Sequence, residues 1–383
     1  MIPYATFYYF IILAILLIPS IIAGLNGKSL KTYNSVVAIF FLVLTFYNKP
    51  AQAISLIIFV IWQVVLIKGY LPVRKKNNPT SMFYLTVALS ILPLVIVKFA
   101  PYFKSLSMVG FLGISYLTFR AVQMIIDIRD GQLKEVSVYR FLRFLLFFPT
   151  ISSGPIDRYR RFEKDIEHTP TSAEYKELLY RGINRIIQGF LYKFIIGYLI
   201  NQHILMSGYL KQDTFLSIVI YMYAYSMYLF FDFAGYSNFA IGTSYLLGIK
   251  TPENFNKPFL SRNIKDFWNR WHMTLSFWFR DYIFMRFVFT MTKKKVFKNR
   301  YTTSYIGIFI NFFVMGLWHG PFPHYIVYGL LHTFYFIFFD VFERKNKKHK
   351  FWPDNKLTHV LSVVITFNFV CFSLLIFSGR LFT

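Results

Sequence analysis

Long apolar stretches alternate with short polar connections along most of this chain. An α-helix needs about 20 predominantly apolar residues to cross a bilayer, and shorter apolar runs are typical of tilted, broken or re-entrant helices. The predicted spans are Phe7–Leu25, Asn34–Tyr47, Ala51–Ile67, Met82–Phe99, Leu106–Ile126, Leu178–Leu205, Phe215–Asp232, Asn238–Ile249, Thr303–Trp318, Tyr325–Phe342 and Leu357–Phe377. The pattern predicts an all-α polytopic membrane protein with about eleven transmembrane helices and some short interfacial and re-entrant helices.

Two stretches differ from simple spans. "FFPTISSGPIDRYRRFEKD", from Phe147, places two prolines and a glycine after an apolar run, which is typical of a helix that stops and exposes a basic rim. "IKDFWNRWHMTLSFWFRDYIFMRF", from Ile264, repeats apolar residues every three or four positions and predicts one amphipathic helix at the membrane interface. Its apolar stripe consists of Ile264, Trp268, Trp271, Leu275, Trp278 and Tyr282.

Composition agrees with a membrane protein. Hydrophobic residues make up 56% of the 383 residues and charged residues only 15%, which exceeds what a single soluble core hides. Neither repeats nor a low-complexity linker divides the chain, so residues 1–383 are predicted to form one membrane domain. The first apolar stretch lacks the charged start and cleavage site of a signal peptide and is predicted to be retained.

The net charge of +25 is concentrated in short loops between the spans. This distribution is typical of cytoplasmic loops that face anionic lipid, which makes nucleic-acid binding the poorer interpretation. Cys371 is the one cysteine, which excludes an intramolecular disulfide and a cysteine-based metal cluster. No HExxH spacing occurs either, and we predict no metal site.

His319 is the first candidate for chemistry, because a polar residue deep in a span normally lines a cavity or contacts a partner. The surrounding "GLWHGPFP" ends the preceding helix at Gly320 and Pro321, and a broken helix at membrane depth is tolerated beside protein or water. We therefore expect the imidazole at the bottom of a polar pocket. The alternative is a buried histidine that bonds a freed carbonyl, and His324 and His332 are interpreted as loop and helix-packing residues.

His272 is the second candidate. Asn269, His272 and Ser276 are spaced by three and four residues, so they would share one face of the predicted helix. An ordinary interfacial histidine bonded to its neighbours explains the same spacing. Asp232, at the end of a predicted span and followed by two glycines that permit close helix packing, could orient a base or cap a helix.

Near neutral pH, an imidazole can take the proton of a hydroxyl that attacks an acyl carbon. The chain has no GxSxG elbow, P-loop or GxGxxG turn, which counts against serine catalysis, nucleotide hydrolysis and dinucleotide chemistry. An acyl transfer from an activated donor needs none of these motifs.

The motifs "FFPTISSGPIDRYRRF", "YLFFDFAGYSNFAIG", "KDFWNRWHMTLSFWFRDYIF" and "GLWHGP", in this order, resemble the membrane-bound O-acyltransferase family. The resemblance implies a ring of helices around a central funnel or tunnel. It also implies that His319 matches the invariant histidine of the family and acts as general base. His272 matches the second family histidine, which is asparagine or aspartate in many members. The expected substrate-binding residues are Trp268, Asn269, Ser276, Trp318 and Asp232.

The resemblance also implies partners. Members that D-alanylate teichoic acid work with a DltC-like D-alanyl carrier protein, whose phosphopantetheine arm delivers the acyl group, so no cofactor is expected to bind this chain itself. Lipoteichoic acid is the eventual acceptor, and DltD-like and DltX-like membrane proteins take part. The expected carrier-docking residues are Arg158, Arg160, Arg161, Lys293 and Lys294, although simple positive-inside topology explains each of these loops as well.

Two other functions stay open from the residues alone. An O-acetyltransferase that acts on an exopolysaccharide would share both histidines but use another donor. A lipid or glycan transporter would use the tunnel without bond chemistry, and scattered intramembrane charges would favour it. The predicted spans contain few such charges, which favours the enzyme.

Overall fold

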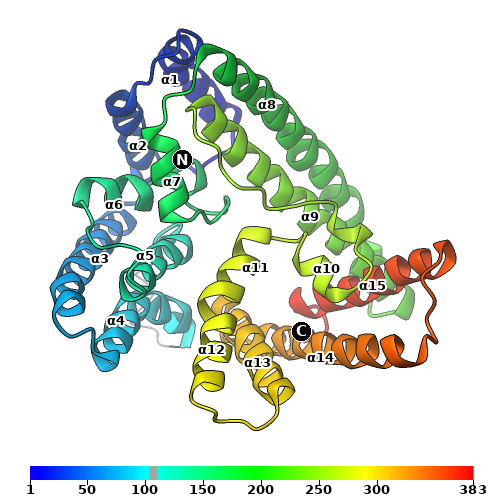
Figure 1. Ribbon diagram of the computed structural model, residues 1–383. Helices are drawn as coiled ribbons and strands as arrows, with labels where there is room; N and C mark the ends of the chain where they lie inside the picture. The colour runs from blue at the N-terminus through cyan, green and yellow to red at the C-terminus, as the bar shows by residue number, and fades with distance from the viewer. Residues whose placement is uncertain (103–109, 383) are drawn as a thin grey trace. The chain divides into compact units, whose positions relative to one another are not determined.

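The apolar runs fold as α-helices, and the computed structural model describes residues 1–102 and 110–382 (Figure 1). Within these two ranges no β-strand occurs. Among the described residues, seven helical segments are long and apolar enough to cross a membrane. They are Phe7–Leu25 (α1), Pro50–Lys76 (α3), Thr80–Tyr102 (α4 and η1), Phe215–Leu246 (α9), Arg300–His319 (α13), Pro323–His349 (α14) and Lys356–Phe377 (α15). The prediction of an all-α polytopic membrane protein is confirmed.

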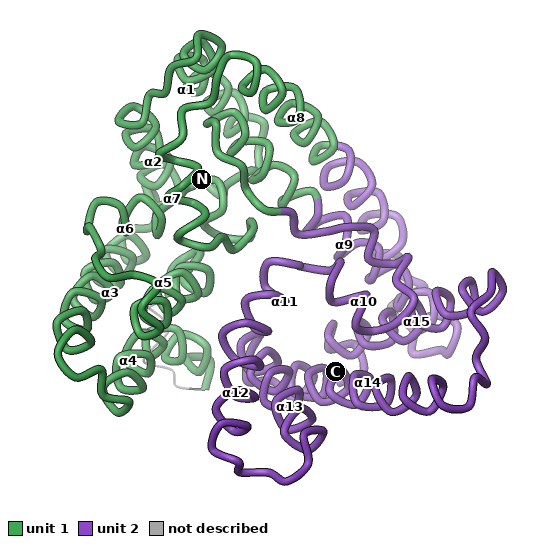
Figure 2. The backbone as a smooth tube through the Cα atoms, in the orientation of Figure 1, with its two compact units in different colours: residues 1–190, 235–252 green, residues 191–234, 253–383 purple. Residues whose placement is uncertain are grey.

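The described residues divide into two units, residues 1–190 with 235–252 and residues 191–234 with 253–383 (Figure 2). Besides α1, α3 and α4, the first unit contains α2 (Lys31–Phe46), α5 (Ile114–Arg129), α6 (Val138–Leu145), η2 (Phe148–Thr150), α7 (Tyr159–Glu167), α8 (Ser172–Phe190) and the end of α9. Besides α13, α14 and α15, the second contains η3 (Leu191–Gly197), η4 (Ile200–Leu205), η5 (Gly208–Lys211), the start of α9, η6 (Pro258–Leu260), α10 (Ile264–Trp268), α11 (Met273–Phe279), η7 (Arg280–Phe284) and α12 (Met285–Lys293).

Helix α9 corrects the predicted set of spans. It is one helix of 32 residues, whereas the sequence pattern predicted two spans that meet near Gly235. One glycine costs a helix only about 1 kcal/mol, which is too little to end a helix that is held by its neighbours. Asp232 therefore lies inside α9 and caps no helix end. The predicted span Leu106–Ile126 lies partly outside the described residues, and its part from Ile114 onward belongs to α5.

In the first unit, α8 and the end of α9 approach closely (Figure 1). A Cβ atom on Gly242 would lie 2.7 Å from the carbonyl oxygen of Gly182 on α8. Only a residue without a side chain allows this separation, as is common where small residues face each other between membrane helices. The predicted role of a glycine in helix packing is confirmed at Gly242.

The proline-containing stretch after α6 breaks the helical backbone, as predicted, because α6 ends at Leu145 and α7 begins only at Tyr159. Arg120 of α5 is fully buried and satisfies the carbonyl groups that this break leaves without helical partners. Its guanidinium donates to Phe144 O at 3.1 Å, Leu145 O at 2.9 Å and Thr150 O at 2.7 Å. A buried arginine thus supplies the hydrogen bonds that irregular backbone requires inside an apolar unit.

Candidate active site

His319 is the last residue of α13, which lies beside α14 in the second unit (Figure 1). Two glycines allow the close contact between these helices. A Cβ atom on Gly316 would lie 2.5 Å from Tyr325 O, and one on Gly329 would lie 2.4 Å from Phe312 O. The backbones of α13 and α14 are therefore in direct contact, which restricts movement of the end of α13, where His319 lies, more than contact between long side chains would.

Aromatic rings surround the His319 imidazole. The ring centroids of Trp318 and Phe377 lie 4.5 Å and 4.8 Å from it, and those of Tyr325 and Tyr328 lie at 5.7 Å and 6.2 Å. The side chain nevertheless keeps part of its surface accessible. Trp318, a predicted substrate-binding residue, is thus in direct contact with the predicted general base.

A cavity of about 270 Å³ lies within the second unit. Its wall consists of Lys265, Trp268, Asn269, Ser276, Arg280, Phe284, Ser304, Ile308, Asn311, Phe312, Met315, Phe336 and Asp340. The α13 residues in this set recur every three or four positions from Ser304 to Met315, so they form one face of the helix. His319 continues this spacing one turn beyond Met315 but is not among the residues that line the cavity, so its expected place at the bottom of a polar pocket stays a prediction.

Polar groups of the cavity are placed along its wall. Lys265 binds Asp340 at 3.2 Å and Glu343 at 3.0 Å, and the second cation of the wall, Arg280, binds Asp281 at 2.9 Å. Asn311 is buried, and its Oδ1 atom has no hydrogen-bond partner among the described residues. A buried acceptor of this kind is costly unless a ligand or water supplies a donor. The cavity also brings together three predicted substrate-binding residues, Trp268, Asn269 and Ser276.

The predicted single amphipathic helix from Ile264 is wrong, because the chain breaks between α10 and α11. His272 adopts the left-handed conformation there, with φ 42° and ψ 51°. Two backbone bonds hold the break, from Met273 N to Asn254 O and from Asn256 N to Arg270 O, each at 2.9 Å. Left-handed backbone costs a residue with a side chain about 1–2 kcal/mol, and such strain is concentrated at functional sites.

The break removes His272 from the helical face predicted for Asn269 and Ser276, and His272 is not among the residues that line the cavity. Its ring packs edge-on against Phe233, with the centroids 4.6 Å apart. The residue lies outside the seven candidate spans, and burial lowers its pKa to about 3. Nε2 has no hydrogen-bond partner among the described residues, so the structure holds a neutral imidazole with one free nitrogen.

His332, interpreted from the sequence as a packing residue, is fully buried and bonded at both ring nitrogens. Trp268 Nε1 donates to its Nδ1 at 3.2 Å, so the ring proton is on Nε2, which donates to Ser373 Oγ at 3.1 Å. The Tyr328 ring lies 4.5 Å from that of His332 and also contacts His319. His332 thus connects α10, α14 and α15 behind the candidate site. No local signal in the sequence marks this role, because all of its partners are distant along the chain.

Asp232 has a cationic partner, since Lys193 Nζ donates to its Oδ1 atom. Lys193 lies in η3, where the backbone takes π-helical turns, and such turns often occur at functional sites. The predicted substrate-binding carboxylate is therefore one half of an ion pair between two helices. A lysine inside the predicted span Leu178–Leu205 was a visible signal for this pair.

The five predicted carrier-docking residues differ in their exposure and in their bonds to other residues of the chain. Arg161 is held by Asp157, by Asp165 at 2.8 Å and by the carbonyl of Lys250. Arg160 is exposed and donates to Gln132 at 3.3 Å, and Arg158 is half-buried. Lys293 and Lys294 are exposed at the end of α12. The exposed cations are the ones whose charge can reach a partner.

The described residues thus form a multi-pass helical protein in which a histidine ends a spanning helix and is surrounded by aromatic rings. The model of the family described as "MBOAT, membrane-bound O-acyltransferase family" matches residues 40–378, which run through both units. The chain belongs to this family, so the prediction of a membrane-embedded O-acyltransferase is confirmed.

Relatives with curated names agree. The chain is 55% identical to "Teichoic acid D-alanyltransferase" of Bacillus subtilis (strain 168), covering 100% of this chain and 99% of that protein. It is 48% identical to "Teichoic acid D-alanyltransferase" of Lacticaseibacillus rhamnosus, covering 99% and 97%. "Probable alginate O-acetylase AlgI" of Pseudomonas aeruginosa is 33% identical, but the match covers 58% of this chain and 41% of that protein.

Proposed function

We propose that this chain transfers D-alanine from a carrier-borne thioester toward hydroxyl groups of teichoic acid in a Gram-positive cell envelope. The full-length identity to two enzymes named for this reaction supports the substrate. The observation that carries the mechanism is the position of His319, which lies at the end of α13 among aromatic rings, one turn beyond the last cavity-lining residue of that helix.

The proposed step needs one base and an activated donor. The His319 imidazole takes the proton of the acceptor hydroxyl while its oxygen attacks the thioester carbonyl carbon. The carbon–sulfur bond breaks, the ester forms, and the leaving sulfur receives the proton from the imidazolium. General base catalysis of this kind contributes roughly 10² to 10⁴ in rate, and no protein nucleophile is required.

The cavity is suited to the arm of the donor. Phosphopantetheine is a phosphate joined to a chain with two amide groups that ends in the thiol. Asn311 Oδ1 would accept an amide N–H, and Asn269 and Ser276 would bond the remaining amide atoms. Lys265 and Arg280 would face the phosphate. In this proposal the arm would not be a resident cofactor of the chain, because a DltC-like carrier protein would bring it and remove it after transfer.

The same proposal assigns the remaining partners. Lipoteichoic acid is the eventual acceptor, and DltD-like and DltX-like membrane proteins would take the acyl group onward. Exposed Arg160, Lys293 and Lys294 would attract an acidic carrier, because opposite charges speed the encounter. His272 would act through position rather than as a base, since its burial favours the neutral ring.

The O-acetyltransferase alternative is weaker, because the relatives with that name match little more than half of this chain. A transporter without bond chemistry is weaker again, since the chain belongs to an acyltransferase family.

The test uses membranes that contain the full chain and its partners, supplied with carrier protein that bears labelled D-alanine. We expect His319→Ala to lower the rate of label transfer by at least a hundredfold. His324→Ala is the matched control, because it removes another imidazole five residues away and should keep most of the activity. Wild-type transfer by His319→Ala would overturn the catalytic role. Transfer of acetyl groups from another donor, without any from the carrier, would overturn the proposed substrate.

A further inference from the structure

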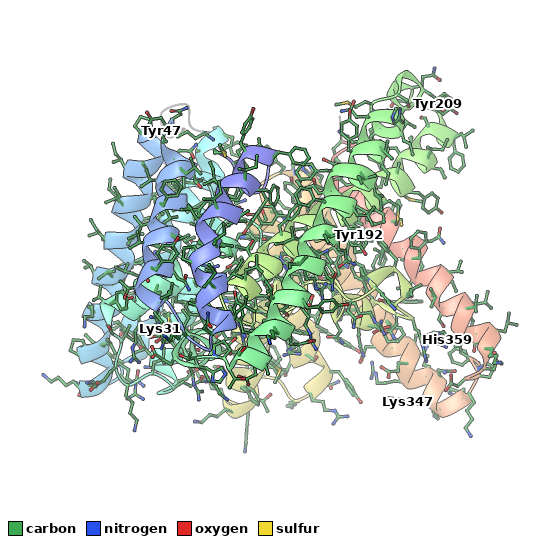
Figure 3. All side chains as sticks on the ribbon, turned by 90° about the horizontal axis from the view of Figure 1, so that it is seen from above. Lys31, Tyr47, Tyr192, Tyr209, Lys347 and His359 are labelled. Carbon is green, nitrogen blue, oxygen red and sulfur yellow. The ribbon has the colours of Figure 1, made fainter. Side chains whose placement is uncertain are left out.

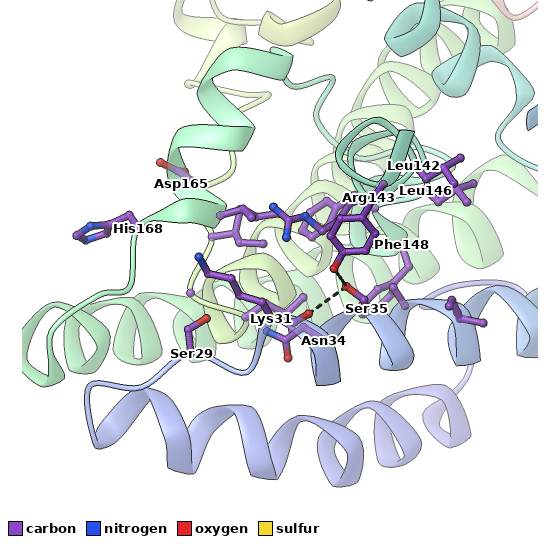
Figure 4. A pocket seen from close by; sticks show the side chains of 18 of the residues that line it. Ser29, Lys31, Asn34, Ser35, Leu142, Arg143, Leu146, Phe148, Asp165 and His168 are labelled. Atoms are coloured by element: carbon purple, nitrogen blue, oxygen red, sulfur yellow. Dashed lines mark hydrogen bonds between the residues drawn. The ribbon is translucent and has the colours of Figure 1, made fainter. Parts of the chain in front are cut away.

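A second cavity, of about 230 Å³, lies entirely within the first unit (Figure 4). Its wall comes from α2, α6, the end of α7 and the segment after α9. None of these residues belongs to the candidate active site. Any ligand of this cavity would therefore bind separately from the substrates of the candidate active site.

One face of α2 forms a continuous wall of the cavity. Lys31, Ser35, Ala38 and Leu42 line it at spacings of three and four residues, which places them on one side of the helix. This wall is about 16 Å long at the helical rise of 1.5 Å per residue. Its composition changes along the helix from cationic and hydroxylic at Lys31 to aliphatic at Leu42.

Helix α6 repeats the same division across the cavity. Figure 4 shows the Lys31 ammonium and the Arg143 guanidinium directed toward the same space, while Leu142 and Leu146 lie to one side of them. Ile39 of α2 is 60% exposed, so the aliphatic part opens onto the surface of the helix bundle. In a membrane protein, an apolar wall that opens outward faces acyl chains. The cavity thus has a charged end and a lipid-facing end.

The charged end already holds an anion of the chain itself. The Glu167 carboxylate lies 3.2 Å from both Lys31 Nζ and Arg143 Nη2, and the hydrogen bond from Lys31 lowers the pKa of Glu167. Glu167 is about half exposed, so this carboxylate can move aside or share its donors. The position is therefore one at which the fold stabilises negative charge.

The cationic groups at this end retain a hydrogen-bond donor for a further anion. Lys31, Arg140 and Arg143 face two carboxylates, Glu163 and Glu167. Arg143 donates from Nη2 to Glu167, whereas its buried Nε has no hydrogen-bond partner among the described residues. Asp165, which also lines the cavity, lies 2.8 Å from Arg161 and shares this guanidinium with Asp157.

The location along the chain agrees with a lipid head group. Lys31 begins α2, and Lys28 precedes it in the short loop after the apolar helix α1. Figure 3 shows Lys31 and Tyr47 at the two ends of α2. Basic residues in short loops mark the cytoplasmic side, where the leaflet is rich in anionic lipid. The Lys31 end of the cavity is then at the level of the phosphates, and the Leu42 end is at the level of the acyl chains.

We propose that this cavity binds an anionic diacyl glycerophospholipid, with its phosphate at Lys31 and Arg143 and one acyl chain along Ala38, Ile39 and Leu42. The site holds lipid as a structural component of the first unit and takes no part in acyl transfer. Its occupancy is therefore independent of the proposed function.

The test is a lipid titration of the delipidated full-length chain, followed by native mass spectrometry. The probes are phosphatidylglycerol and phosphatidylcholine with identical acyl chains. We expect the first phosphatidylglycerol to bind at least fivefold more tightly, since its head group keeps a net negative charge that choline cancels in phosphatidylcholine, and one basic residue near an anionic head group contributes about that factor. Lys31→Gln should lower affinity for phosphatidylglycerol about fivefold and affinity for phosphatidylcholine clearly less, whereas Lys28→Gln in the same loop should change neither.

A second variant tests the acyl end without altering charge. Ala38→Phe places a ring in the cavity and should lower the affinity for both lipids, while Val36→Phe, on the exposed opposite face of α2, should not. Equal binding of the two lipids by the wild-type chain would overturn the proposal, as would equal effects of Ala38→Phe and Val36→Phe. Binding of free glycerol phosphate as tightly as phosphatidylglycerol would also overturn it, because the acyl wall would then be irrelevant.

Discussion

Trp268 donates a hydrogen bond from Nε1 to Nδ1 of His332 over 3.2 Å, and both side chains are buried. Trp268 lines the cavity of the second unit, and His332 of α14 packs against Tyr328. Tyr328 in turn contacts His319. The cavity wall and the surroundings of the candidate base are therefore parts of one packed group. A substitution of Trp268 should therefore alter both the cavity wall and the packing around His319.

The first prediction concerns this bond. Trp268→Phe removes the donor and leaves Nδ1 of His332 buried without a partner, which should cost about 1–3 kcal/mol in the free energy of unfolding. The double variant Trp268→Phe/His332→Phe removes both polar groups and should lose clearly less than the two single variants added together. Unfolding in detergent, followed by tryptophan fluorescence, measures all three. Additive losses would show that the two residues do not depend on each other.

The second prediction concerns the contact of α13 with α14. Gly329→Ala would place a methyl group 2.4 Å from Phe312 O, so one helix must shift, at a cost of about 1–3 kcal/mol. Because His319 ends α13, the shift should also lower the transfer rate. Gly69→Ala in α3 is the control, since its added Cβ meets nothing within 4 Å and alanine is the better helix former. Equal stability of the two variants would contradict the close helix contact.

Much of the helical architecture was predictable. Each membrane span must form the hydrogen bonds of its backbone internally, as a helix does, and must present apolar side chains to lipid, so spans appear as long apolar runs in the sequence. The pattern failed where tertiary contacts decide the backbone. The break at His272 depends on bonds to Asn254 and Asn256, which lie more than ten residues earlier and outside any helical repeat. The local spacing of apolar residues favoured one continuous helix there, but the hydrogen bonds to Asn254 and Asn256 hold the backbone in a break.

The candidate site was predictable to a similar degree. His319 was recognisable because an imidazole beside Gly320 and Pro321 is out of place in hydrocarbon. Asn311, by contrast, resembles many polar residues in helices, and only the cavity shows that its Oδ1 atom has no partner among the described residues. The hydrogen bonds at both ring nitrogens of His332 could not be predicted either, because their partners Trp268 and Ser373 lie 64 and 41 residues away along the chain.

The third prediction separates two roles of Asp232. Asp232→Ala leaves the Lys193 ammonium without its partner, which should cost up to about 3 kcal/mol in a membrane helix. The double variant Lys193→Met/Asp232→Met removes both charges and should recover most of this stability. We expect the double variant to keep the wild-type KM for the acylated carrier, which would restrict Asp232 to helix pairing. A KM several times higher in a stable double variant would instead support the predicted substrate-binding role.

The fourth prediction concerns the pH dependence of stability that His272 causes. The pKa of the folded state, about 3, lies below the ordinary value of 6.5 because burial opposes the charged ring. Protonation therefore favours the unfolded chain, so this contribution is complete above about pH 6.5 and declines as the pH falls toward 3. Between pH 7.5 and pH 5.0 the wild-type chain should lose about 2 kcal/mol through this residue alone.

The variant His272→Asn removes the titrating ring and should lose correspondingly less stability over the same interval. Unfolding in detergent at the two pH values measures the difference, with His359→Asn at the start of α15 as the control for loss of a histidine. A decline in His272→Asn as steep as that of the wild-type chain would mean that the ring is hydrated and free to charge. Its left-handed backbone would then position no buried neutral imidazole, and the proposed positional role of His272 would lose its physical basis.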